Sequence, residues 1–353
     1  MSLPHICLIY TGGTIGMVRE GGVLRPPADP SAFLEIAPEL SQVADITFVP
    51  LMNKDSANIS PQDWTTIAEA IHERMGTGFD GFVVAHGTDT MQFTASAVAF
   101  AFGPELSVPI VFTGSQSEAS NLHGDARMNL VRAALVASGS IAEVVIVFGD
   151  YVFRAVRSQK RDRRRFAAFE SPAYAPLAEI ADEIIVHPDA RVRRPGAPVP
   201  ELRADFSADV VQVTLIPGLH ADSVLPLLTV DSTRGVILQS YGAGNVPDAG
   251  RYSLVPFIEA AVATDVPVIL TSQFPANSTL HSPYATGVHA RRAGAIATGN
   301  MTNSAACVKF RWILAELARE AEDGAMTASD KLEQVRARMT SPYVGELDVE
   351  PSS

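Results

Sequence analysis

The segment Ile6–Met17, ICLIYTGGTIGM, joins a short apolar run directly to a glycine-rich turn. Its apolar residues follow one another without alternation, which is typical of a strand buried on both faces of a parallel sheet. Gly12 and Gly13 suit the turn, because glycine adopts backbone angles that other residues avoid. A turn does not need the β-branched hydroxyls of Thr11 and Thr14. Two interpretations of Thr14 follow: it caps a helix, or it takes part in chemistry.

Short apolar runs and amphipathic stretches alternate through the first half of the chain. Strands are expected at Ile6–Tyr10, Ile46–Leu51, Gly81–Ala85, Ile110–Thr113 and Val144–Phe148. Helices are expected at Pro61–Met75, Thr90–Phe102 and Asn121–Ala137. This alternation predicts an α/β domain whose mainly parallel sheet is flanked by helices.

The composition changes over residues 188–207, where four prolines and scattered arginines show no periodicity. Such a segment is typical of a linker between domains. After it, strands are expected at Val210–Leu215, Gly235–Gln239, Val268–Thr271 and Ala295–Ile296. The alternating helices are expected at Val224–Leu228, Ser253–Ala263, Pro283–Ala293 and Asn303–Glu320. The sequence therefore predicts a larger catalytic α/β domain at 1–187, a linker at 188–207 and a smaller α/β domain at 208–353.

Composition and charge narrow the class of protein. With 353 residues, 47% hydrophobic and 19% charged, the chain has the profile of an ordinary globular protein. A net charge of -12 argues against general nucleic-acid binding, which requires Lys and Arg to neutralise phosphates. The local run KRDRRR at 160–165 is the exception, and we interpret its arginines as a solvated surface or a subunit contact.

Only two cysteines occur, Cys7 and Cys307, and both lie in apolar stretches. They are expected to be small core residues, and they predict neither a disulfide framework nor a metal site. The N-terminus shows no signal peptide, and no apolar stretch approaches the ~20 residues that span a bilayer. A cytoplasmic protein without membrane contact is expected.

Polar segments follow the expected strands, at the sheet edge where α/β proteins bind ligands. They are TGGTIG at 11–16, HGTDT at 86–90, TGSQ at 113–116 and FRAVRSQK at 153–160. A Thr or Ser nucleophile needs a neighbouring base, and Asp89 and Lys160 are the candidates for base and orienting group. The alternatives are structural: Thr88–Asp89 as an Asx-type turn and His86 as a hydrogen-bonded core residue. A phosphate loop is disfavoured, because TGGTIG lacks the Lys-Ser/Thr ending.

Taken together, the motifs resemble those of the L-asparaginases of the bacterial cytoplasmic type (type I). The two signatures are YTGGTIGM at 10–17 and HGTDTM at 86–91. The resemblance continues in order through TGSQ, GDARMNL, KRDRRRFAAF, YGAGNVP and YATG, so it covers nearly the whole chain. It implies a larger N-terminal domain, a smaller C-terminal one, and an active site between them. The implied reaction is hydrolysis of L-asparagine to L-aspartate and ammonia through an acyl-enzyme, without metal or cofactor.

The resemblance also implies roles for particular residues. Thr14 matches the primary nucleophile, while Thr88, Asp89 and Lys160 match a second catalytic set in which Lys and Asp tune a hydroxyl. Ser56 matches the residue that holds the substrate α-carboxylate, and Asp89 also meets the α-ammonium. The implied substrate contacts are Gly13, Ser56, Thr88, Asp89, Gly114, Ser115 and Asn245. Because Asn245 matches a residue supplied by a neighbouring subunit, a homodimer or homotetramer is expected.

The chain departs from the family pattern in the loop after TGGTIG. Many members carry a Tyr there, whereas this loop reads VREGGVLRPPADP at 18–30, so the base that activates Thr14 is left open. Glycines and charges in Gly16–Pro30 suit a mobile lid. Ala57, Gln159 and Phe274 replace residues that elsewhere bind substrate or a regulatory asparagine. Three functions stay open: asparaginase, glutaminase or dual amidase, and a non-catalytic amino-acid-binding protein.

Overall fold

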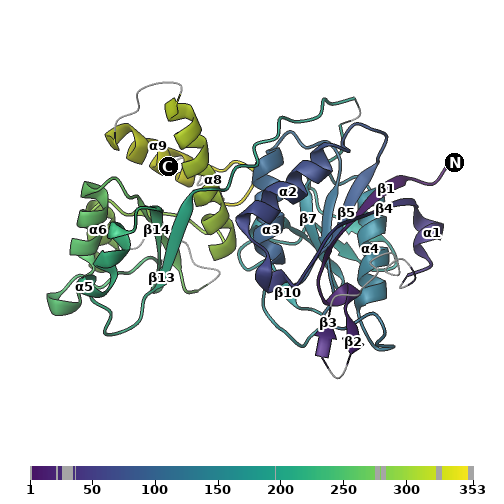
Figure 1. Ribbon diagram of the computed structural model, residues 1–353, viewed down its shortest axis with the longest axis horizontal. Helices are drawn as coiled ribbons and strands as arrows, with labels where there is room; N and C mark the ends of the chain where they lie inside the picture. The colour runs from purple at the N-terminus through teal and green to yellow at the C-terminus, as the bar shows by residue number, and fades with distance from the viewer. Residues whose placement is uncertain are drawn as a thin grey trace. The chain divides into compact units, whose positions relative to one another are not determined.

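The computed structural model describes residues 2–20, 23–25, 35, 37–194, 196–274, 279, 284–322 and 328–348. The chain divides into two compact units, Met1–Ala204 and Asp205–Ser353. Each unit is an α/β layer structure with its own sheet (Figure 1).

The N-terminal unit contains one sheet of eight strands in the order β12-β11-β8-β7-β6-β5-β1-β4. The strands are β1 His5–Gly12, β4 Asp45–Lys54, β5 Gly81–Ala85, β6 Ile110–Thr113, β7 Val144–Phe148, β8 Tyr151–Arg154, β11 Ala178–Ile180 and β12 Ile184–Val186. The five strands from β4 to β7 pair in parallel, and β8, β11 and β12 extend the sheet with antiparallel pairs. The expectation of a mainly parallel sheet is confirmed.

Helices cover both faces of this sheet (Figure 1). α4 Ala126–Ser138 packs on β5, β6 and β7, and α1 Leu40–Val43 packs beside α4. On the other face α3 Met91–Phe102 contacts β6 and β7, and α2 Pro61–His72 packs against α3. Side chains of both parities in β1, such as Leu8 and Ile9, are therefore almost fully buried, as the unbroken apolar run predicts.

Helix ends follow local side-chain chemistry. A reciprocal capping box between Ser60 and Asp63 starts α2, with Pro61 in its first turn. The expected helix start at Asn121 is wrong, because α4 begins at Ala126. The reason is that Asn121 and Gly124 close a turn, and the carboxylate of Asp125 accepts backbone hydrogen bonds from the preceding loop.

The C-terminal unit holds a four-stranded parallel sheet in the order β13-β14-β15-β16. Its elements are β13 Asp209–Thr214, β14 Thr233–Ser240, β15 Val268–Ser272, β16 Ile296–Ala297, α5 Ala221–Val224, α6 Val255–Ala263, α7 Ala285–Arg292, α8 Asn303–Glu322 and α9 Ala328–Thr340. Phe257 and Ile258 of α6 lie in its core with Val236 and Leu238. On α8, Lys309 forms a fully buried ion pair with Glu346, at 2.5 Å, which ties the segment after α9 to the unit.

Several elements have no counterpart among the expected ones: α9, the antiparallel strands of the first sheet, and two short hairpins. One hairpin pairs β2 Val18–Glu20 with β3 Val23–Arg25, inside the segment expected to be a lid. The rest of that segment, at 21–22 and 26–30, lies outside the described residues. Pro283, the expected start of α7, also lies outside them, and the helix itself begins at Ala285.

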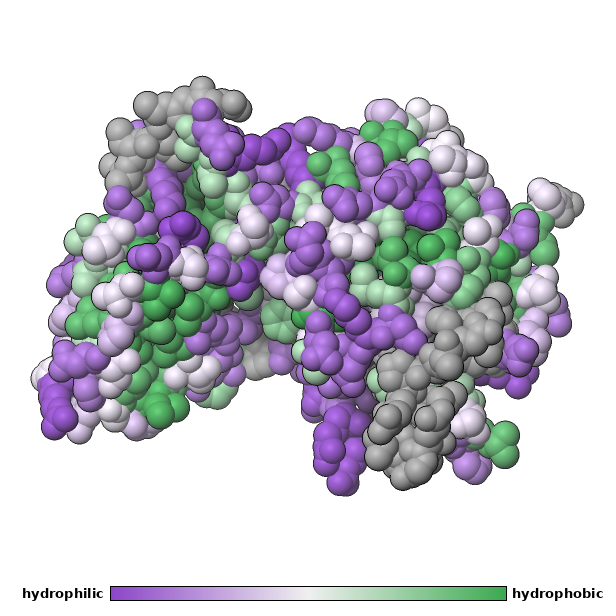
Figure 2. Space-filling model, viewed as in Figure 1, coloured by the Kyte–Doolittle hydropathy of each residue, from purple (hydrophilic) through white to green (hydrophobic). Residues whose placement is uncertain are grey.

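The surface of each unit is mainly polar on the face seen in Figure 2, with apolar residues in separate patches. Among the helices of the described residues, none combines the length and the apolar character that a membrane span requires.

Candidate active site

A cavity of about 360 Å³ lies at the carboxyl edge of the N-terminal sheet. β1 sits between β4 and β5, so the chain order of the parallel strands reverses on either side of β1. Such a switch point is where open α/β sheets bind ligands. The cavity is lined by Gly13, Thr14, Met17, Asp55, Ser56, Gly87, Thr88, Asp89, Gln116, Lys160 and Arg163. These residues follow β1, β4, β5 and β6 or belong to the segment after β8.

Glycines let three of these loops approach one another closely. Gly13 has a φ of +90°, and a Cβ built on it would lie 2.4 Å from the backbone nitrogen of Gly87. A Cβ on Gly87 would lie 2.6 Å from the hydroxyl oxygen of Ser56. No side chain fits at either position without moving the loops apart. The close approach therefore brings Thr14, Ser56 and Thr88 onto one cavity.

Thr14 begins a short 3-10 turn, Thr14–Gly16, but it does not cap this turn, because the N-cap position belongs to Gly13. The side chain of Thr14 is half-buried and makes no hydrogen bond within the part of the chain that the structure describes. By contrast, the Thr11 hydroxyl donates to the Ala85 carbonyl at 3.0 Å and joins β1 to β5. The two threonines of the opening motif thus differ: Thr11 is structural, and Thr14 presents a hydroxyl to the cavity.

Lys160 connects the second polar loop to the cavity. Its ammonium donates to the Thr88 hydroxyl at 2.7 Å and to an Asp89 carboxylate oxygen at 2.6 Å. The Lys160 side chain is 13% exposed, whereas that of Asp89 is 68% exposed to solvent. Lys160 ends β9 Gln159–Lys160, which pairs with β10 Phe169–Glu170 and so fixes its position. The four residues expected to be catalytic, Thr14, Thr88, Asp89 and Lys160, therefore all line one cavity.

Ser56 enters the cavity from the loop after β4 and is 4% exposed. Its backbone carbonyl accepts a 2.8 Å hydrogen bond from the Thr90 hydroxyl, which joins this loop to the start of α3. The neighbouring Asp55 carboxylate accepts from the Ala57 amide at 2.9 Å and caps the turn Ser56–Asn58. The Ser56 hydroxyl and the Asp55 carboxylate thus both line this end of the cavity.

The loop after β6 is held by buried polar contacts. Asp125 accepts from the backbone amides of Gln116 and Ser117 at 3.0–3.1 Å, and the Asn129 side chain donates to the Gly114 carbonyl at 2.9 Å. Of the expected substrate contacts, Gly114 and Ser115 are not part of the cavity lining, and Gln116 takes their place. The Ser115 hydroxyl is buried and donates to the Ser117 carbonyl instead.

His86 lies beneath this loop system and is 1% exposed. Its Nδ1 donates to the Gly87 carbonyl at 2.7 Å, while Nε2 is buried without a hydrogen-bond partner among the described residues. Desolvation lowers the pKa of His86 to about 4, against smaller opposing effects of the Gly87 hydrogen bond and of the Asp63 charge. His86 is thus a neutral structural support, in agreement with the core interpretation of its sequence pattern.

The last expected substrate contact, Asn245, belongs to the C-terminal unit. It lies in the turn after β14, where its backbone pairs with Tyr241 and its side chain accepts from the Thr286 hydroxyl at 3.2 Å. Sequence reasoning did not single out Met17, Asp55, Gly87 or Arg163, all of which line the cavity. For Asp55 and Gly87 a signal exists, since each adjoins a predicted site residue.

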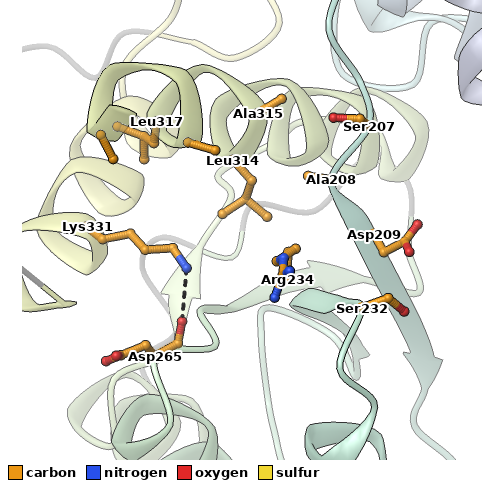
Figure 3. Close-up of a pocket in the computed structure, with 12 residues that line it drawn as sticks. Ser207, Ala208, Asp209, Ser232, Arg234, Asp265, Leu314, Ala315, Leu317 and Lys331 are labelled. Carbon is orange, nitrogen blue, oxygen red and sulfur yellow. Dashed lines mark hydrogen bonds between the residues drawn. The ribbon is translucent and has the colours of Figure 1, made fainter. Parts of the chain in front are cut away.

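A second cavity, of about 550 Å³, lies in the C-terminal unit between α8 and the amino ends of its strands (Figure 3). Leu314 and Leu317 form its apolar wall, and the Lys331 ammonium donates to the Asp265 carbonyl at 3.2 Å. Its lining serines, Ser207 and Ser232, form no side-chain hydrogen bond with a carboxylate or a lysine among the residues that the structure describes. Among the described residues no group of His, Cys, Asp and Glu side chains has the arrangement of a metal site. The cavity around Thr14 is therefore the candidate active site.

Family models match both units. The model "Asparaginase, N-terminal" matches residues 5–191, and "Glutaminase/Asparaginase C-terminal domain" matches residues 209–323. The chain belongs to the asparaginase family. It is 34% identical to L-asparaginase 1 of Escherichia coli (strain K12) over 90% of this chain and 93% of that protein. It is also 30% identical to a glutamyl-tRNA(Gln) amidotransferase subunit of Methanothermobacter thermautotrophicus, over 98% of this chain and 77% of that protein.

Solved structures agree with this assignment. The crystal structure of L-asparaginase I from Vibrio cholerae superposes with a TM-score of 0.83 at 29% identity, covering 99% of this chain and all of that one. An asparaginase-family amidohydrolase of type I, as the motifs suggest, is thus confirmed at the level of family and fold. In this asparaginase-family chain, residues of both signatures, YTGGTIGM and HGTDTM, line the cavity around Thr14.

Proposed function

We propose that the chain hydrolyses L-asparagine to L-aspartate and ammonia, with Thr14 as the nucleophile. The observation that carries the proposal is the pair of Lys160 hydrogen bonds, to Thr88 and Asp89, on the cavity that Thr14 also lines. Attack on a stable amide requires a hydroxyl, a group that takes its proton, and donors that face the developing oxyanion. The cavity offers all three kinds of group.

In the proposed first step, the Thr14 oxygen bonds to the carboxamide carbon, and the C–N bond breaks. The Thr14 proton leaves with the amide nitrogen as ammonia, and an ester of Thr14 remains. Water then attacks the ester, which releases aspartate and restores the Thr14 hydroxyl. The ionisable groups on the cavity lining are Asp55, Asp89, Lys160 and Arg163. Of these, only Lys160 contacts a second hydroxyl on the lining, so we assign proton transfer to Thr88 and Lys160.

Two further features of the cavity suit bound asparagine. The backbone amides of Thr14 and Thr88 donate to no acceptor within the described ranges, so each is available to an oxyanion. Asp89 turns one oxygen to Lys160 and stays exposed, which suits an α-ammonium, and Ser56 suits the α-carboxylate. Glutamine is the second candidate substrate, because one methylene changes binding by only ~1–3 kcal/mol. The relative named for glutamyl-tRNA(Gln) amidotransferase makes this candidate worth testing.

We also propose that the protein acts in the cytoplasm as a homo-oligomer, with Asn245 of one subunit reaching the cavity of its neighbour. The support is the family assignment and the placement of Asn245 on a partly exposed turn of the C-terminal unit.

Lys160→Met tests the assignment of the proton-transfer group. Loss of such a group typically lowers the rate by ~10²–10⁴-fold, so kcat for asparagine should fall by that amount while the KM changes less. The matched control is Arg164→Met, since Arg164 is an exposed cation on the same segment and does not line the cavity. Ammonia release from asparagine and from glutamine should be measured for wild type and both variants. Equal, small effects of the two substitutions would remove Lys160 from the mechanism.

A further inference from the structure

Arg163 was expected to belong to a solvated surface or a subunit contact, yet it lines the same cavity as Thr14 and Lys160. We infer that Arg163 is a specificity-determining residue that binds the free carboxylate of the substrate. The inference rests on the proposed function, because it concerns the substrate of that same site.

The first argument is how the segment around Arg163 is held. The Asp162 carboxylate accepts from the backbone amides of Arg164 and Arg165 at 2.6 and 3.1 Å, which folds residues 162–165 into a compact turn. The Gln116 side chain donates to the Asp162 carbonyl at 3.0 Å and joins this turn to the loop after β6. The turn thus fixes Arg163 beside the cavity through two independent sets of contacts.

The second argument is that Arg163 is the unpaired arginine on the cavity lining, whereas Arg161 and Arg165 are paired and Arg164 does not line the cavity. Arg161 pairs with Glu170 at 3.0 Å, and Arg165 pairs with Asp162 at 3.7 Å. Arg163 is exposed and forms no ion pair or side-chain hydrogen bond with any residue that the structure describes. Its guanidinium is therefore available to an incoming ligand.

The third argument is the charge balance of the cavity. Two carboxylates, Asp55 and Asp89, line it together with two cations, Lys160 and Arg163. Lys160 is engaged by Asp89 at 2.6 Å, so an entering carboxylate meets Asp55 and one available cation. A guanidinium binds carboxylates through charge-assisted hydrogen bonds, frequently two at once. Without Arg163 the lining would carry a net negative charge and repel the carboxylate end of an amino acid.

The test is a thermodynamic cycle in which the Arg163 side chain and the substrate carboxylate are removed separately and together. Ammonia release is measured for wild type, Arg163→Met and the control Arg164→Met, with L-asparagine and with its α-methyl ester, which lacks the carboxylate. For asparagine, Arg163→Met should raise the KM by about 10- to 100-fold and change kcat less, while Arg164→Met resembles wild type. For the ester, wild type and Arg163→Met should have the same KM.

A binding measurement separates this inference from the proposed function. If wild type releases no ammonia from asparagine or glutamine, the proposed function fails, and calorimetric titration with L-aspartate still tests Arg163. Arg163→Met should then weaken aspartate binding by a similar factor, and Arg164→Met should not. The inference is overturned by equal behaviour of the two variants, by an equal loss on asparagine and its ester, or by wild type that binds no aspartate.

Discussion

Replacing His86 by Asn should make the stability of the N-terminal unit less sensitive to acid. The folded imidazole is buried, and its pKa is lowered to about 4 from the ordinary value of 6.5. In the unfolded chain the ring binds a proton below about pH 6.5, whereas the folded ring stays neutral until about pH 4. The unfolded state therefore binds more protons in this window, and the free energy of unfolding falls as the pH drops through it. The interval between the two pKa values corresponds to about 3 kcal/mol, fully lost below pH 4.

Asn is the suitable replacement, because its side-chain amide can donate to the Gly87 carbonyl as Nδ1 does and cannot be protonated in this range. The assay is urea unfolding at several pH values from 7 to 4 in a Trp312→Phe background, where Trp64 on α2 remains the only Trp. His86→Asn should show a shallower loss of stability on acidification than its parent. His187→Asn, at an exposed site, should keep the parent's pH dependence. Parallel curves for His86→Asn and its parent would refute the reasoning.

Three further outcomes are expected. Gly13→Ala should abolish ammonia release, because the added Cβ would lie 2.4 Å from the Gly87 backbone; wild-type turnover would contradict the close approach of the two loops. Glu346→Ala should destabilise the C-terminal unit by ~3–5 kcal/mol in urea unfolding, because it leaves Lys309 buried and unpaired. Glu320→Ala removes the more exposed ion pair with Arg338 and should cost at most ~1 kcal/mol. Similar losses for the two variants would count against a large contribution of the Lys309–Glu346 pair. Sedimentation at assay concentration should show a homo-oligomer, and a fully active monomer would exclude a role for Asn245 across an interface.

The sequence pattern was sufficient for the parallel strands, and the physical reason is visible in their burial. β5, β6 and β7 match the expected ranges residue for residue, because each is an unbroken apolar run buried on both faces. The antiparallel strands β8, β11 and β12 were not predicted, since they are short and partly exposed and therefore carry a weaker apolar signal. The start of α4 was missed because Asp125 serves the preceding loop, a tertiary contact that periodicity does not encode.

The candidate site shows the same division. Strand-end motifs brought Thr14 and Thr88 under consideration, the family resemblance added Ser56, and the structure places all three on one cavity. Lys160 and Arg163 lie three positions apart in one basic run. The sequence of that run does not predict that Lys160 is hydrogen-bonded and that Arg163 is unpaired. Only the turn centred on Asp162 and the β9–β10 pairing decide which cation contacts Thr88 and which is available to a ligand.

The most direct test of the central claim is ammonia release from L-asparagine by wild type and by Thr14→Ala, with L-aspartate binding measured on both. Wild type should release ammonia in proportion to the aspartate formed. Thr14→Ala should lose turnover almost completely and still bind aspartate, because the expected binding groups, Ser56 and Asp89, lie on other loops. Turnover of more than a few per cent by a folded Thr14→Ala protein would contradict the assignment of Thr14 as nucleophile.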